Sequence, residues 1–248
     1  MAFGPDGDVL AGLDLEIAEG EFVVLVGPTG CGKTVTLRLL AGFERPTGGD
    51  LRYDGQVISG PDPQRGMVFQ DIVLFPWMTV LDNVAFGPRV RGTGAQEALR
   101  RARESLAAVD LGPFEGRHPF ELSGGMQQRV GLARVLVNDP RLILCDEPFG
   151  SLDWITREGL QDLLLALWAR TGKTVVLATH SIEEAVYLAQ RVVLLTPRPA
   201  AVQEVIAIDL PGARGAAVRF HPRYAEYVEA IGSAVAGERP TGAAASRG

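Results

Sequence analysis

The chain has 248 residues, a length that suits one α/β domain with room for an inserted subdomain. Its formal net charge of −6 argues against nucleic acid as the main partner, because phosphate backbones favour basic surfaces. No apolar run approaches the roughly 18 residues that a membrane-spanning helix needs, and 2 cysteines are too few for a disulfide framework or a zinc site. The first residues lack the basic and apolar regions of a signal peptide, so we expect a soluble, cytoplasmic protein.

The first part of the chain predicts a strand, a helix, a hairpin and another strand. Residues 21–27, EFVVLVG, form an apolar run that ends in glycine, which is typical of a buried strand. Residues 35–43 have the amphipathic pattern of a helix. Residues 50–59 alternate and contain Asp54-Gly55, a dipeptide that favours a hairpin turn. Residues 65–70 predict the second strand.

The second part of the chain begins with a long helical stretch, residues 94–138, and then returns to strands. Residues 141–148, 174–180 and 191–196 are apolar runs of strand length. Between the last two, Ser181 is the expected N-cap of a helix, and Glu184 three residues later would complete a capping box. Residues 221–235 predict a terminal helix, and residues 238–248 a disordered tail.

Apolar strands separated by helices predict an α/β fold whose sheet is mostly parallel and covered on both faces. The hairpin near residue 54 adds an antiparallel β region near the N-terminus. Because residues 94–138 interrupt the alternation of strands and helices, we interpret them as an inserted helical subdomain.

The stretch GPTGCGKT has the spacing of a phosphate-binding loop, and it lies between a predicted strand and a predicted helix, as that loop requires. Its glycines allow backbone N–H groups to face phosphates, Lys33 would reach the β- and γ-phosphates, and the hydroxyl of Thr34 would bind Mg²⁺. The candidate nucleotide-binding residues of this loop are Gly27, Pro28, Thr29, Gly30, Cys31, Gly32, Lys33 and Thr34.

Polar residues follow three of the predicted strands, where open α/β sheets bind ligands. Asp146 would hold Mg²⁺, and Glu147 could orient or deprotonate an attacking water. His180 should emerge at the same sheet edge and could contact a γ-phosphate, although a histidine at a strand end is more often an ordinary surface residue. Gln70 could sense Mg²⁺ and water in the same way, and it is an equally open case.

A second glycine-containing stretch, ELSGGMQQRVGLARVL, places Ser123, Gly124 and Gly125 just ahead of a predicted helix. Small residues that expose N–H groups at the positive end of a helix form an anion site. One phosphate loop suffices to cradle one nucleotide, so this stretch raises the question of what a second anion site does.

The order of these motifs resembles that of the nucleotide-binding subunits of ABC transporters over nearly the whole chain. The resemblance implies that ATP and Mg²⁺ bind and that ATP is hydrolysed on a P-loop NTPase fold of the ABC type. It also assigns roles: Lys33 and Thr34 to Walker A, Asp146 to Walker B, Glu147 as the catalytic base, Gln70 to the Q-loop, Asp153 to the D-loop, His180 as the switch histidine, and Ser123 to Gly125 as the signature. Phe3 stands in register for the aromatic that stacks on adenine.

Longer segments are similar to importers of nitrate, alkanesulfonates and taurine, among them ISGPDPQRGMVFQ and LFPWMTVLDNVAFG. That resemblance implies a homodimer on ATP binding, two transmembrane permease subunits docked near residues 70–87, a solute-binding protein outside, and a peripheral position on the cytoplasmic face of the membrane. No role with nucleic acid is implied. The alternatives are a soluble ABC ATPase that acts on nucleic acid or ribosomes, and an efflux subunit.

On this interpretation the chain divides into four segments. The expected bounds are residues 1–93 for the first part of the nucleotide-binding core, 94–138 for the helical subdomain, 139–200 for the second part of the core, and 201–248 for a C-terminal strand, helix and tail.

Overall fold

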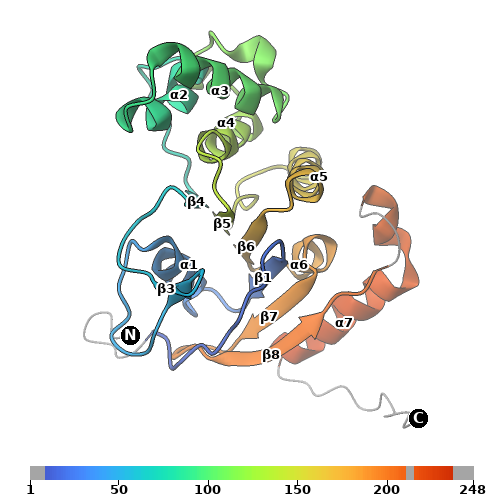
Figure 1. Cartoon of the computed structure of the whole chain (residues 1–248). Coiled ribbons are helices and arrows are strands. Elements are labelled where there is room, and N and C mark those ends of the chain that lie inside the picture. The colour runs from blue at the N-terminus through green and yellow to red at the C-terminus, as the bar shows by residue number, and fades with distance from the viewer. Residues whose placement is uncertain (1–8, 211–214, 237–248) are drawn as a thin grey trace.

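The computed structural model describes residues 9–210 and 215–236, and a six-stranded sheet forms the centre of the described chain (Figure 1). Phe3 and the predicted tail lie outside the described residues. The strand order is β4-β5-β6-β1-β7-β8, and all neighbours are parallel except β7 and β8. The strands are β1 Phe22–Val26, β4 Arg65–Val68, β5 Leu142–Asp146, β6 Thr174–Thr179, β7 Arg191–Leu195 and β8 Val202–Ala207.

Helices cover both faces of this sheet, as the apolar strands predicted. Along β1, Phe22 and Val24 point into one core cluster while Val23 and Leu25 point into the other, so each face of the sheet has its own core. The helices are α1 Lys33–Ala41, α2 Val80–Val90, α3 Ala95–Ala107, α4 Gly124–Leu136, α5 Trp154–Thr171, α6 Ile182–Leu188 and α7 Pro222–Ala236. Short 3-10 turns are η2 Gly112–Phe114, η3 Pro119–Glu121 and η4 Ala216–Phe220.

The predicted hairpin near the N-terminus is present. Strands β2 Arg52–Tyr53 and β3 Gln56–Val57 pair antiparallel across Asp54 and Gly55, whose φ angles are 50° and 73°. Positive φ at both central residues is what a tight two-residue hairpin requires, and this explains the Asp-Gly pair.

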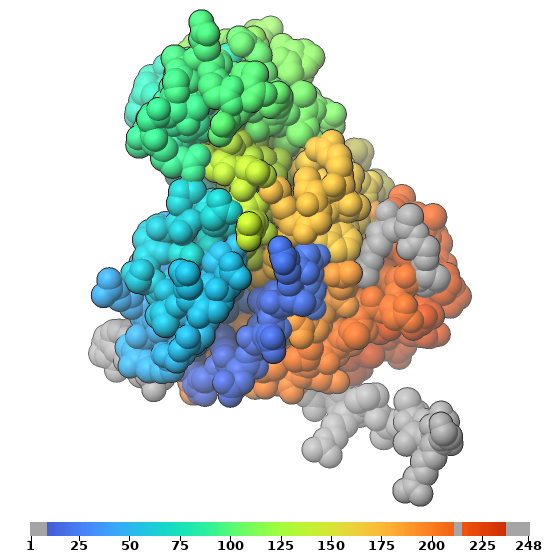
Figure 2. Space-filling view, in the orientation of Figure 1, coloured from blue at the N-terminus to red at the C-terminus, as the bar shows by residue number. Residues whose placement is uncertain are grey.

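Helices α2, α3 and α4 form a separate helical group above one end of the sheet (Figures 1 and 2). Val80, Val84 and Ala85 of α2 are fully buried in the core cluster that also holds residues of α3. The helical group of the structure therefore includes α2, which lies before the predicted helical segment 94–138. Thr79 caps α2 by accepting a hydrogen bond from the Asp82 N–H at 3.1 Å, a local signal that the sequence contains.

Among the described residues, no helix combines the length and apolar character needed to cross a membrane.

Candidate functional site

The phosphate-binding loop joins β1 to α1, and its glycines occupy positions that other residues could not. Gly30 and Gly32 have φ angles of 78° and 123°. A Cβ at Gly32 would lie 2.7 Å from Leu10 Cδ2, which a leucine side chain can relieve by moving, so it is the positive φ that favours glycine there. Gly32 provides no side-chain cap for α1, which leaves the first N–H groups of that helix available to an anion.

Lys33, the first residue of α1, is curled back over this loop. Its Nζ donates to the carbonyl oxygens of Gly27 at 2.8 Å and Pro28 at 3.2 Å, and the side chain is buried. The ammonium is therefore already held above the loop whose N–H groups would bind phosphate. This arrangement fits the predicted role of Lys33.

Thr34 and Asp146 meet at the base of the loop, although 112 residues separate them in the sequence. The Thr34 hydroxyl donates to Asp146 Oδ1 at 3.0 Å. Burial raises the pKa of Asp146, the Thr34 hydrogen bond opposes that rise, and the neighbouring charge of Glu147 adds to it. A buried carboxylate beside a hydroxyl supplies the hard oxygen ligands that Mg²⁺ prefers, and a cation would offset the cost of burying the charge.

Glu147 and His180 are brought together at the carboxyl edge of the sheet, because β5 and β6 are adjacent and parallel. His180 Nδ1 lies 3.1 Å from Glu147 Oε2. Glu147 has a φ of 42°, a left-handed conformation that is strained for a residue other than glycine. Its N–H donates to the Ala178 carbonyl at 2.9 Å, so this backbone is held by the neighbouring strand.

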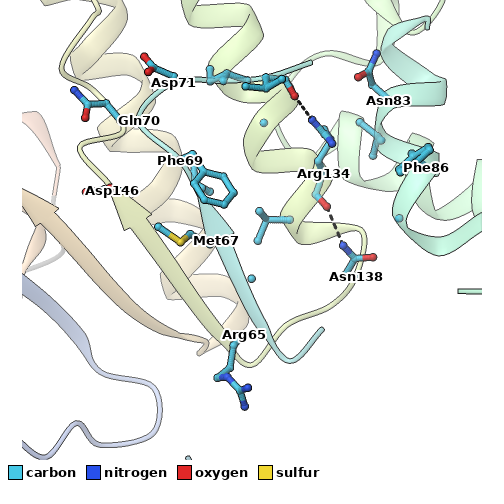
Figure 3. Close-up of a pocket in the computed structure, with 18 of the residues that line it drawn as sticks. Arg65, Met67, Phe69, Gln70, Asp71, Asn83, Phe86, Arg134, Asn138 and Asp146 are labelled. Carbon is cyan, nitrogen blue, oxygen red and sulfur yellow. Dashed lines mark hydrogen bonds between the residues drawn. The ribbon is translucent and has the colours of Figure 1, made fainter. Parts of the chain in front are cut away.

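Gln70 lies just beyond β4, at the mouth of a cavity of about 780 Å³ between the sheet edge and the helical group (Figure 3). Thr34 and Asp146 line one end of the same cavity. The other end is lined by Phe75, Asn83, Phe86 and Arg134. The structure thus places Gln70 with the predicted Mg²⁺ ligands and also next to the helical group.

The predicted second anion site lies outside the cavity that holds Thr34 and Asp146. Ser123 caps α4 by accepting from the Met126 N–H at 3.3 Å, and Asp153 caps α5 by accepting from the Thr156 N–H at 3.1 Å. A Cβ at Gly125 would lie 2.1 Å from Thr156 Cγ2, so the starts of these two helices are in close contact. Neither Ser123 nor Asp153 lines the cavity that holds Thr34 and Asp146.

The hydrogen bonds of Asp153 affect its pKa. Its carboxylate accepts from the Thr156 hydroxyl at 2.6 Å as well as from the Thr156 N–H. The side-chain bond and then the backbone bond from Thr156 lower the pKa of Asp153. These two hydrogen bonds hold the Asp153 carboxyl group at the start of α5.

Ser181 caps α6, as predicted, by accepting from the Glu184 N–H at 3.3 Å. The reciprocal bond of a capping box is absent, which corrects the prediction. The Ser181 N–H donates instead to Thr179 Oγ1 at 3.0 Å, and the Thr179 hydroxyl donates to Glu184 Oε2 at 2.6 Å. The hydroxyl competes for the carboxylate because Thr179 ends a strand that faces the same turn.

Two residues that organise the cavity wall were not predicted. The buried Asn83 donates to the carbonyls of Phe75, Met78 and Thr79 and accepts from the Phe75 N–H. Arg134 donates to the Val73 carbonyl at 2.6 Å, with its guanidinium 5.0 Å from the centre of the Phe75 ring. A polar residue on the apolar face of α2 was the only available signal for Asn83, and none pointed to the Val73 contact.

Comparison with known proteins places this fold and site in a family. A family model described as "ABC transporter" matches residues 10–150. The chain is 47% identical over 241 residues to the taurine import ATP-binding protein TauB of Pseudomonas savastanoi pv. phaseolicola, covering 95% of this chain and 92% of that protein. It is 49% identical over 201 residues to an uncharacterized ABC transporter ATP-binding protein, MJ0412, of Methanocaldococcus jannaschii, covering 81% of this chain and 75% of that one.

Solved structures agree with this assignment. The ATP-binding cassette MJ0796, solved as a dimer in a post-hydrolysis state bound to ADP and Pi, superposes with a TM-score of 0.72 at 32% identity, covering 84% of this chain and 95% of that one. The family model and these relatives show that the chain belongs to the ABC transporter family, and it is therefore an ATPase that binds ATP and couples its hydrolysis to transport.

Proposed function

We propose that the chain is the ATP-hydrolysing subunit of an importer for a small oxyanion, with taurine as the first candidate and other sulfonates or nitrate as alternatives. The relatives named as taurine import proteins carry this proposal, because their similarity extends over nearly the whole chain. The oxyanion itself would be recognised by a solute-binding protein and by permease subunits, which are separate chains.

The residues at the carboxyl edge of the sheet would carry the reaction. The N–H groups of Thr29, Gly30 and Gly32 and the ammonium of Lys33 would bind the phosphates. Thr34, Asp146 and Gln70 would hold Mg²⁺, which when bound neutralises phosphate charge. Glu147 would accept the proton of the attacking water, and His180, 3.1 Å from the Glu147 carboxylate, would hold that carboxylate and the water in place.

A second copy of the chain would complete each ATP site. Ser123 and Gly124 are exposed at the N-terminus of α4, with Gly125 buried behind them, and Ser123 does not line the cavity that holds Thr34 and Asp146. In a head-to-tail dimer this surface would face the γ-phosphate bound by the partner copy. Loss of that phosphate charge on hydrolysis would weaken the contact and allow the copies to separate.

The cavity beside Gln70 would receive the permease. Its wall continues into an exposed aromatic segment in which Trp77 is 71% exposed and lies 5.6 Å from Phe75 between ring centroids. Apolar side chains left at a surface favour a protein contact. Two permease subunits docked along residues 70–87 of two copies would hold the ATPase on the cytoplasmic face of the membrane.

Two experiments test the proposal. Glu147→Gln should abolish ATP hydrolysis while ATP-dependent dimerisation, followed by size-exclusion chromatography, persists; wild-type hydrolysis in this variant would show that the proposed base is wrong. Deletion of the gene should prevent growth on taurine, another sulfonate or nitrate as the only sulfur or nitrogen source. Normal growth on all three would refute the proposed solute class, and co-purification with DNA or ribosomes would favour the alternative function.

A further inference from the structure

Glu184 is a buried carboxylate that none of the roles proposed above uses. It lies in the first turn of α6, four residues after His180, and is only 6% exposed. Burial raises the pKa of this carboxyl group, while the Thr179 hydrogen bond and the Arg157 charge oppose the rise. A buried carboxylate needs hydrogen-bond or charged partners, and the partners of Glu184 lie next to His180.

One oxygen of Glu184 is connected by hydrogen bonds to the residues on both sides of His180. The Thr179 hydroxyl donates to Glu184 Oε2 at 2.6 Å, and the same hydroxyl oxygen accepts from the Ser181 N–H at 3.0 Å. Thr179 immediately precedes His180, and Ser181 immediately follows it. A single relay of two hydrogen bonds therefore fixes both neighbours of the histidine, which itself is largely exposed.

The other oxygen of Glu184 faces the segment that follows Glu147. Arg157 of α5 lies with its Nε 3.9 Å from Glu184 Oε1. The same guanidinium donates through Nη2 to the Leu152 carbonyl at 2.9 Å. His180 Nδ1 also contacts Glu147 Oε2 directly at 3.1 Å. Glu147 and His180 are therefore connected in a second way as well: along the chain from Glu147 to Leu152, then through Arg157, Glu184 and Thr179 to His180.

We propose that Glu184 is a positioning residue that, through Thr179, sets the position of His180 relative to Glu147. Arg157 connects Glu184 to the segment before α5. This inference rests on the proposed roles of His180 and Glu147. A histidine displaced by about an ångström loses its alignment with the reacting groups, and such displacements lower turnover by up to about a hundredfold.

Thr179→Val tests the relay, because valine keeps the shape and removes the hydroxyl. We expect kcat for ATP hydrolysis to fall roughly tenfold or more, with the KM for ATP changed less than about twofold, and Thr179→Ser to restore it. Thr174→Val is the matched control: it makes the same change at the other end of β6, where the hydroxyl accepts from the Gly20 N–H at 2.9 Å. Wild-type kcat in Thr179→Val would overturn the proposal.

A spectroscopic measurement separates positioning from general damage. The chain has 3 histidines, so the imidazole resonances can be assigned by NMR in the nucleotide-free protein. We expect Thr179→Val and Glu184→Ala to shift the His180 resonance in the same way and leave those of His118 and His221 in place, and Thr174→Val to shift none. An unmoved His180 resonance in Thr179→Val would refute the inference.

Two further variants complete the design. If Thr179 and Glu184 act through one relay, the double variant should lower kcat no further than the stronger single variant, and simple additivity would contradict the inference. If His180→Ala hydrolyses ATP at the wild-type rate, the proposed role of His180 is wrong, while the NMR comparison still decides whether Thr179 and Glu184 position it.

Discussion

Gly125→Ala is expected to separate the starts of α4 and α5 and to destabilise the chain. The new Cβ would lie 2.1 Å from Thr156 Cγ2, whereas ordinary carbon contacts begin near 3.4 Å. Thr156 cannot rotate away freely, because its hydroxyl donates to Asp153 Oδ2 at 2.6 Å. Overpacking of this kind costs about 1–3 kcal/mol of the free energy of unfolding, and the backbone of one helix start must move.

Gly124→Ala provides a matched control at the adjacent position. A Cβ at Gly124 meets nothing within 4 Å, so alanine there should leave stability unchanged or raise it by up to about 1 kcal/mol through helix propensity. Urea denaturation of the two variants, without nucleotide, measures the difference directly. If Gly125→Ala were as stable as Gly124→Ala, the close contact between the two helix starts would be wrong.

Three further predictions follow from the same structure. Ser123→Arg should leave ATP binding to the single chain intact and prevent ATP-driven dimerisation, as measured by nucleotide titration and size-exclusion chromatography; a variant that still dimerised would contradict the proposed contact. Trp154, 68% exposed at the start of α5, should shift its fluorescence to shorter wavelength when ATP is added to Glu147→Gln carrying Trp77→Phe, and an unchanged spectrum would place it outside the dimer contact. Because burial raises the pKa of Glu184 above 4.5, the folded chain binds this proton more tightly than the unfolded chain, so its contribution to stability falls as pH rises from about 4.5 through the raised value. Glu184→Gln should therefore weaken the decline of melting temperature over that window, and identical pH profiles would refute the assignment.

Contiguous patterns in the sequence were enough to predict the phosphate loop and the sheet edge. GPTGCGKT carries its signal within eight consecutive residues, since strand, glycines, lysine and helix follow one another directly. The apolar runs before Asp146 and His180 predicted parallel strands, and parallel strands bring their carboxyl ends to one edge. Local order in the chain therefore implied that Glu147 and His180 lie at the same sheet edge, and the structure adds the contact between them across 33 residues of sequence.

Specific side-chain contacts could not be predicted in the same way. Helix α2 joins α3 and α4 through buried side chains such as Val84, a packing arrangement that the local pattern did not indicate. The capping box at Ser181 was half wrong because Thr179, on the preceding strand, took the carboxylate that the local pattern assigned to the Ser181 N–H. In both cases a specific side-chain contact decided the arrangement, and a single sequence shows only the local preference.

The predicted signature segment is connected to the surroundings of His180 by contacts that run through the start of α5. Gly125 leaves room for Thr156, Thr156 is held by Asp153, and Arg157 in the next position faces Glu184 and the segment before α5. A second copy bound at Ser123 would therefore contact the start of α5, which packs through Arg157 against Glu184 near His180. A chain of contacts is not yet a coupling, because energy can spread through many routes in a protein. The decisive measurement is a double-mutant cycle between Gly125→Ala and Thr179→Val, which lie at the two ends of the path: a non-additive effect on ATP hydrolysis would show that the two positions are energetically coupled, and an additive effect would contradict the coupling.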